Sequence, residues 1–195
     1  MKRRHLSLLL TVAVALAGCR PASAGQPFAP YPKTEPGTVY HYAAFEAGAG
    51  GKLKRSGNAT LTISAPIRVG EHDYLRSDLV VNGKDFGEVR YRFDKEYTVL
   101  GSQAPDTESS LITMFVNPPK PGTQIQTRTV TTRVIEQAPL TIEGVTYQNL
   151  IAVELMNGAQ LTLRHVIDRD AGIVKTTLWH EGRIFGELLR LPKAP

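Results

Sequence analysis

Hydrophobic and polar residues alternate with a period of two over much of the chain after residue 37, and this pattern predicts β-strands. The clearest case is residues 88–94, where Val89, Tyr91 and Phe93 alternate with charged residues. Successive side chains of a strand point to opposite faces. One charged and one apolar face therefore indicate an antiparallel sheet that is solvated on one side. The same alternation occurs in residues 60–64, 151–155 and 161–165.

Turn signals separate these segments about every 8 to 12 residues, which favours an all-β fold. Asn82-Gly83 and Asn157-Gly158 are strong hairpin signals, because a type I′ turn needs positive φ at both central residues. Glu143-Gly144 and Glu181-Gly182 are weaker versions. We therefore expect a curved antiparallel sheet, half-barrel or barrel of roughly nine to ten strands.

Three further elements complete the predicted domain, which spans residues 38–195. Thr107 to Met114 is the single candidate for a short helix, with Asp106 as its cap. Residues 123–136 read as one long strand after a proline-rich crossing. Residues 172–191 read as a terminal hairpin that closes the sheet.

The N-terminus has the features of a secretory signal over residues 1–18. Lys2, Arg3 and Arg4 precede an apolar run from Leu6 to Gly18, which is 13 residues long. A membrane-spanning helix needs about 20 apolar residues. A basic segment followed by so short an apolar run is instead typical of a signal peptide.

The run ends in Leu16-Ala17-Gly18-Cys19, and Cys19 is the only cysteine. This resembles the lipobox of bacterial lipoproteins. The resemblance implies cleavage before Cys19 and a lipid anchor on its thiol, with acyl chains such as palmitate. It also implies sorting to the outer membrane, facing the periplasm, because Arg20 stands where an aspartate would cause retention.

A rival cleavage site leaves a second localisation open. Ala22-Ser23-Ala24 is an A-x-A pattern that an ordinary signal peptidase cuts. Its use would release a soluble periplasmic protein that begins at Gly25.

Residues 19–37 combine the acylated cysteine with a proline-rich tether. Proline excludes a helix or a central strand there. Polyproline geometry rises about 3.1 Å per residue, so the tether could hold the domain roughly 50 Å from the bilayer. It is either a spacer for reaching partners or an ordinary lipoprotein tether. Its prolines are Pro21, Pro27, Pro30, Pro32 and Pro36.

The net charge of +5 falls to +2 once the three basic residues of the signal are removed. So small a charge gives no long-range attraction for nucleic acid. No cysteine follows Cys19, so the hydrophobic core has to stabilise the domain without disulfides.

The motifs of common enzymes and metal sites are absent from the sequence. Gly48-Ala49-Gly50-Gly51-Lys52 lacks the Ser or Thr that follows the lysine of a phosphate loop, and it reads as a flexible basic loop. His165 falls on the apolar face of its strand, as a core or rim histidine. His41, His72, His165 and His180 show no metal-ligand spacing. We expect no metal, no cofactor and no enzymatic activity; a hydrolase without a G-x-S-x-G motif is the remaining catalytic alternative.

Parts of the C-terminal half resemble uncharacterised envelope proteins with a curved antiparallel sheet. The residues concerned are Pro121-Gly122, the stretch from Val145 to Val153, and Gly172 to Lys175. The lipoprotein carriers and receptors of the periplasm share that general architecture. The resemblance implies a binding domain rather than an enzyme.

Aromatic residues are the candidate ligand contacts, because some of them should line the concave face of a curved sheet. There they either pack the core or form an apolar groove for a lipid, an acyl chain or a peptide. We expect non-catalytic binding of a lipid or another apolar ligand. The alternative is an accessory subunit of an envelope assembly, which would bind protein through a strand edge or the charged face around Arg90 and Arg92. The candidate ligand residues are Tyr40, Tyr42, Tyr91, Phe93 and Trp179.

Overall fold

The structure is a computed structural model that describes residues 36–69, 72–93, 97–101, 112–116, 119–168 and 171–192. The predicted signal peptide, Cys19, Arg20 and nearly all of the tether lie outside these ranges. Within them, no helix is long and apolar enough to cross a membrane.

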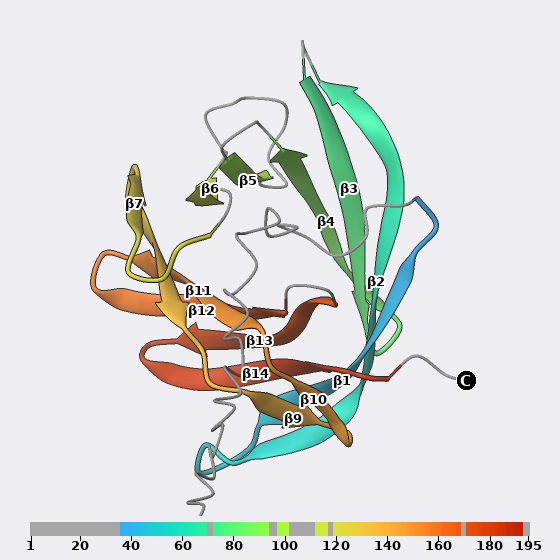
Figure 1. The fold of residues 1–195 in the computed structure, drawn as a ribbon. Coiled ribbons are helices and arrows are strands. Elements are labelled where there is room, and N and C mark those ends of the chain that lie inside the picture. The colour runs from blue at the N-terminus through green and yellow to red at the C-terminus, as the bar shows by residue number, and fades with distance from the viewer. Residues whose placement is uncertain are drawn as a thin grey trace, which may run out of the picture.

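The described residues form fourteen strands and no helix, so the predicted all-β class is confirmed. Twelve strands build one antiparallel sheet in the order β6-β5-β4-β3-β2-β1-β14-β13-β12-β11-β8-β7, and β9 pairs with β10 separately (Figure 1). The strands are β1 (Val39–Ala47), β2 (Leu53–Val69), β3 (His72–Val81), β4 (Lys84–Phe93), β5 (Tyr97–Gly101), β6 (Ile112–Val116), β7 (Gln124–Thr127), β8 (Val130–Glu136), β9 (Leu140–Ile142), β10 (Val145–Tyr147), β11 (Leu150–Asn157), β12 (Gln160–Asp168), β13 (Gly172–His180) and β14 (Arg183–Arg190).

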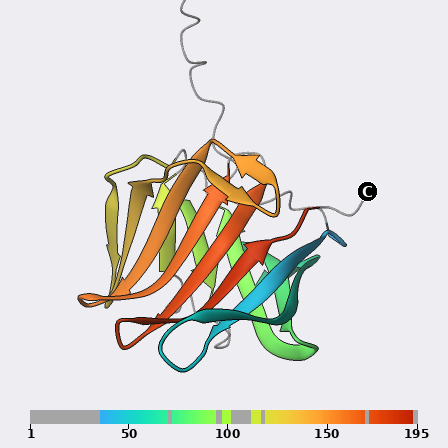
Figure 2. The ribbon, with the colours of Figure 1, turned by 90° about the horizontal axis from the view of Figure 1, so that it is seen from below.

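The sheet curls until its edge strands β6 and β7 come close to each other (Figure 2). In the described structure, hydrogen bonds that involve side chains connect this edge, and no backbone pairing joins β6 to β7. The Thr113 N–H of β6 donates to the Thr127 hydroxyl of β7 at 3.4 Å, and the Thr132 hydroxyl of the adjacent strand β8 donates to the Thr113 carbonyl at 2.7 Å. The curved sheet is therefore not closed.

Two local predictions are wrong. Residues 112–114, the end of the predicted helix, lie in β6, and the rest of that helix lies outside the described residues. Met114 and Phe115 are fully buried in the core, so tertiary packing overrides helix propensity there. The predicted long strand over 123–136 is broken into β7 and β8 at Arg128, which has a φ of 59°.

The hairpin turns follow the glycines, with one shift. Asn82-Gly83 has positive φ at both residues, as a type I′ turn requires, and so do Glu143-Gly144 and Glu181-Gly182. The fourth turn falls on Gly158 and Ala159 rather than on Asn157-Gly158. The structure has more strands than the predicted nine or ten, and β7, β9 and β10, at three or four residues each, account for part of the excess.

The sheet has apolar side chains on both faces of its C-terminal half. The inner face carries the main core, which includes Tyr42, Ile63 and Phe115. A second cluster lies on the outer face of β11, β12 and β13, where the β9–β10 hairpin contributes Ile142 and packs Leu140 and Tyr147 against it. This hairpin gives the outer face the cover under which the candidate site forms.

Candidate functional site

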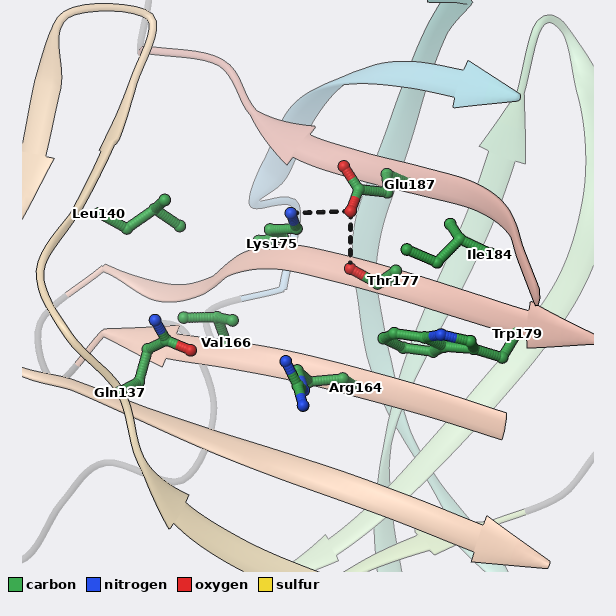
Figure 3. Close-up of a pocket in the computed structure, with 9 residues that line it drawn as sticks. All are labelled: Gln137, Leu140, Arg164, Val166, Lys175, Thr177, Trp179, Ile184 and Glu187. Atoms are coloured by element: carbon green, nitrogen blue, oxygen red, sulfur yellow. Dashed lines mark hydrogen bonds and ion pairs between the residues drawn. The ribbon is translucent and has the colours of Figure 1, made fainter. Parts of the chain in front are cut away.

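A groove of about 230 Å³ lies on the outer face of the sheet (Figure 3). Its floor comes from β12, β13 and β14, and one wall comes from Gln137 and Leu140, at the entry to β9. At roughly 30 Å³ for each water molecule, this volume corresponds to about eight waters. The groove therefore fits a molecule the size of an amino acid or a dipeptide.

Strand register places the lining side chains together. Thr177 is the cross-strand partner of Arg164 on one side and of Glu187 on the other. Trp179 pairs with Ile184, and Val166 pairs with Lys175. Because directly opposite residues share a face of the sheet, polar and apolar side chains converge on the groove.

A bulge in β13 decides which residues reach this face. Val166 pairs with Lys175, but the next residue of β12, Ile167, pairs with Ile173. β13 thus contains one extra residue at this point, and a shift of one residue moves the following side chains to the opposite face. Ile173 joins the inner core, whereas Lys175, Thr177 and Trp179 face the outer groove.

Glu187 is the central acidic group of the groove and is almost fully buried. Its Oε1 accepts the Thr177 hydroxyl at 3.0 Å and the Lys175 Nζ at 2.7 Å (Figure 3). No described residue bonds its Oε2. The Lys175 ammonium has three donors and uses one of them here. The pair therefore presents an unused acceptor beside unused donors.

A second charged cluster supports the other side of the groove. Glu154, 3% exposed, accepts Arg133 Nη2 on Oε2 at 2.7 Å. Its Oε1 accepts Arg164 Nε at 2.9 Å and also bonds Arg164 Nη2. The Arg164 guanidinium carbon lies 5.7 Å from the centre of the Trp179 ring, within the range of a cation–π contact. Arg164 is thus held between a carboxylate and the indole.

The two clusters give the groove a mixed character. In the lining, Arg164 and Lys175 carry positive charge and Glu187 carries negative charge. Glu154 and its second partner Arg133 adjoin Arg164 without lining the groove. Val166, Leu140 and Ile184 add apolar surface beside the indole. Such a lining suits a small charged molecule with an apolar part.

The structure does not bring the sequence-predicted ligand residues into one site. Trp179 lines the groove on the outer face, whereas Tyr40 and Tyr42 lie in the inner core. Tyr91 and Phe93 belong to β4, but their side chains lie outside the described residues.

Sequence reasoning missed Glu154, Arg164, Lys175 and Glu187. The one available signal was a single acid inside an otherwise apolar segment, as at Glu154 between Val153 and Leu155. The partners of Glu154 become evident only from the strand register, which places Arg133 on one side of Glu154 and Arg164 on the other.

His165 lies on the inner face and is not part of the groove. Its Nδ1 lies 2.9 Å from the Thr176 hydroxyl. Burial lowers the pKa of the His165 imidazole from 6.5 to about 4, so the ring is neutral at pH 7. No group of three His, Cys, Asp or Glu side chains among the described residues could hold a metal ion.

The chain matches no known family model, and no curated protein matches it. Two solved structures are similar to it. One is a predicted exported protein with a YmcC-like fold from Bacteroides fragilis, at 9% identity and a TM-score of 0.44, over 82% of this chain and 96% of that one. The other is a predicted lipoprotein from Parabacteroides distasonis, at 13% identity and a TM-score of 0.47, over 82% and 95%. Similarity at this level supports no conclusion about function.

Proposed function

We propose that this chain is a membrane-anchored envelope lipoprotein whose β domain binds a small zwitterionic molecule in the outer-face groove, without converting it. The main support for this proposal is the Glu187 carboxylate, which is almost fully buried beside the Lys175 ammonium. Its Oε2 has no hydrogen-bond partner among the described residues. A ligand of amino-acid or dipeptide size matches the volume of about 230 Å³.

The two charges of a zwitterion complement this pair. A ligand ammonium donates to Glu187 Oε2, and a ligand carboxylate accepts from the unused donors of Lys175. Hydrogen bonds between charged groups are short and about twice as strong as neutral ones. Trp179 supplies a flat apolar surface for the uncharged part of the ligand. Because a zwitterion adds no net charge, the Lys175–Glu187 pair keeps its balance when the ligand binds.

An acyl chain suits this groove poorly. It would cover Lys175, Arg164 and Glu187 without offering them a hydrogen bond, and burying unpaired charges is costly. The volume also lies below the roughly 300–1,000 Å³ of typical pockets for larger ligands.

The anchor is proposed from the lipobox at Leu16-Ala17-Gly18-Cys19. A lipid on Cys19 would keep the domain at the periplasmic side of the outer membrane. Cys19→Ser should then accumulate as unprocessed precursor in an envelope fraction. Normal processing of that variant would favour cleavage after Ala24 and a soluble periplasmic protein.

Isothermal titration calorimetry with alanyl-alanine tests the ligand class. The full mature protein should bind this dipeptide in a saturable manner. Glu187→Gln should weaken binding at least about tenfold, because a hydrogen bond to a charged group contributes roughly 1.5–3 kcal/mol. Glu136→Gln is the matched control, because Glu136 is an exposed acid on β8, and it should leave the affinity unchanged.

Two analogues of alanyl-alanine test the contributions of its ammonium and its carboxylate separately. N-acetyl-alanyl-alanine lacks the ammonium and should lose the contact with Glu187. Alanyl-alanine amide lacks the carboxylate and should lose the contact with Lys175. Equal affinity for all three compounds would show that the charges are not recognised, and the zwitterion proposal would then be wrong.

A further inference from the structure

Arg190 occupies an unusual position on the inner face, at the end of β14. It is the cross-strand partner of Tyr42. Its guanidinium carbon lies 3.9 Å from the centre of the Tyr40 ring and 5.5 Å from that of Tyr42. Its Nη1 donates to the Tyr42 hydroxyl at 3.3 Å, and that hydroxyl donates to the Ile173 carbonyl at 3.2 Å. Two buried tyrosines therefore fix the position of the guanidinium.

No carboxylate in the described structure forms an ion pair with this half-buried arginine. Arg133 and Arg164, by contrast, share Glu154. Asp168 Oδ1 accepts the Ala171 N–H at 2.9 Å. Burial is the main cause of the raised pKa of Tyr147, which the charge of Arg190 lowers and that of Asp168 raises. An arginine has five N–H donors in a fixed fork, and a single one is used here. The charge and most of the fork remain available.

The surroundings of Arg190 on the inner face are apolar. Leu188, two residues earlier on the same strand, is partly buried and packs against the main core, in which Leu61 and Ile63 near Tyr40 are buried. Arg190 itself is only half-buried. A ligand that brings a negative charge to the guanidinium and an apolar part to the partly buried Leu188 would match both features.

Arg190 also lies at the end of the domain that the tether joins. The Leu191 N–H donates to the His41 carbonyl at 2.9 Å, and the Gly37 N–H donates to the Ile63 carbonyl at 2.7 Å. The start of β1 and the end of β14 thus lie at the same end of the sheet (Figure 1). On a protein anchored through Cys19, this end is the one that the anchor holds toward the lipid.

We infer that Arg190, positioned by Tyr40 and Tyr42, binds the phosphate group of an anionic lipid at the tether end of the domain. The planar fork of arginine matches the oxygens of a phosphate in a bidentate manner. The apolar part of the lipid lies against the inner face. This second site is independent of the outer-face groove, because the two use opposite faces of the sheet.

Calorimetry of the full mature protein in a non-ionic detergent provides the test. The probe is dihexanoyl phosphatidic acid, with dihexanoyl phosphatidylcholine and inorganic phosphate as comparators. We expect the acidic lipid to bind at least tenfold more tightly than either. The choline lipid lacks the net negative charge, and inorganic phosphate lacks the apolar part.

Substitutions at Arg190 and its neighbours test whether phosphatidic acid binds at this arginine. Arg190→Gln should lose at least tenfold in affinity for phosphatidic acid, and Arg190→Lys should fall between it and the wild type, because lysine keeps the charge but not the fork. Arg183→Gln is the matched control: Arg183 is exposed on the same strand at its opposite end, and its loss should change nothing. Tyr42→Phe should weaken binding a few-fold, because it removes the hydroxyl that holds Nη1.

Wild-type affinity in Arg190→Gln, or no binding of phosphatidic acid by the wild type, would overturn the inference. Inorganic phosphate that binds as tightly as the lipid would overturn the lipid assignment and leave a simple phosphate site. If Arg190→Gln does not fold, as judged by circular dichroism, Arg190→Lys and Tyr42→Phe decide. Unchanged affinity in both would mean that the guanidinium only stabilises the tyrosine packing.

Discussion

The inner and outer faces of strands β11 to β14 use the same backbone for two different chemistries. On the inner face, Val153, Ile167 and Ile173 are buried in an apolar core, beside which His165 Nδ1 lies 2.9 Å from the Thr176 hydroxyl. On the outer face, Glu154 is buried between Arg133 and Arg164, and Glu187 is almost fully buried beside Lys175. Alternation along each strand creates both faces, and the β9–β10 hairpin makes the second one a covered site.

The two faces therefore differ in how strongly they depend on individual side chains. Apolar packing is non-directional, so a core tolerates changes that keep its volume. Buried charges depend on their partners, and removing one partner leaves a charge without compensation. Apart from Arg190 at the end of β14, the inner face should therefore contribute mostly stability, and the outer face should contribute recognition together with a strict dependence on each charged partner.

The largest loss of stability should come from removing both cationic partners of the buried Glu154. We expect the double variant Arg133→Ala, Arg164→Ala to lose about 3–5 kcal/mol of unfolding free energy, because an unpaired carboxylate then remains in the interior. Chemical denaturation followed by circular dichroism measures this loss.

Placing the same arginine substitutions in a Glu154→Leu background provides the control. With the carboxylate gone, the two arginines are partly exposed side chains, and their removal should cost about 1 kcal/mol or less. A full cost in that background would mean that the arginines stabilise through packing rather than charge.

The second-largest effect is a pH-dependent loss of stability caused by His165 on the inner face. The folded pKa of His165, about 4, lies below its ordinary value of 6.5, so the unfolded chain takes up a proton first as the pH falls. Stability from the neutral imidazole is complete above pH 6.5 and is lost progressively toward pH 4. Between pH 6.5 and 5 the loss should reach at most about 2 kcal/mol, since one pKa unit corresponds to about 1.4 kcal/mol.

His165→Gln removes the titrating group and keeps a polar side chain beside Thr176. The difference in unfolding free energy between the wild type and this variant should shrink as the pH falls from 6.5 to 5. A difference that stays constant over this range would show that His165 does not titrate as a buried group. Urea denaturation at several pH values provides the measurement.

The smallest effect on stability should come from the groove wall. Trp179 is only partly buried, so Trp179→Ala should cost about 1–2 kcal/mol, less than the 3–5 typical of a fully buried tryptophan. Binding of alanyl-alanine should nevertheless fall below detection in this variant. Phe185→Ala, at a neighbouring exposed aromatic, should keep its binding. A variant at Trp179 that binds normally would place the ligand elsewhere.

The sheet could be predicted from the sequence, but the residues of the groove could not. Alternation identified the strands, and Asn82-Gly83 marked a type I′ turn, because both signals act within a few residues. Glu154 is 21 residues from Arg133 and 10 from Arg164, so its partners follow from strand register alone. Trp179 was selected for the concave face, and the bulge in β13 places it on the other face.

The emission of Trp179 reports ligand binding in the groove directly, because this is the only tryptophan of the chain and it lines the groove. Titration of the mature protein with alanyl-alanine should shift this emission in a saturable manner, at the affinity found by calorimetry, and Glu187→Gln should displace the curve to at least tenfold higher concentration. Unchanged emission up to saturating dipeptide would contradict ligand binding in the groove.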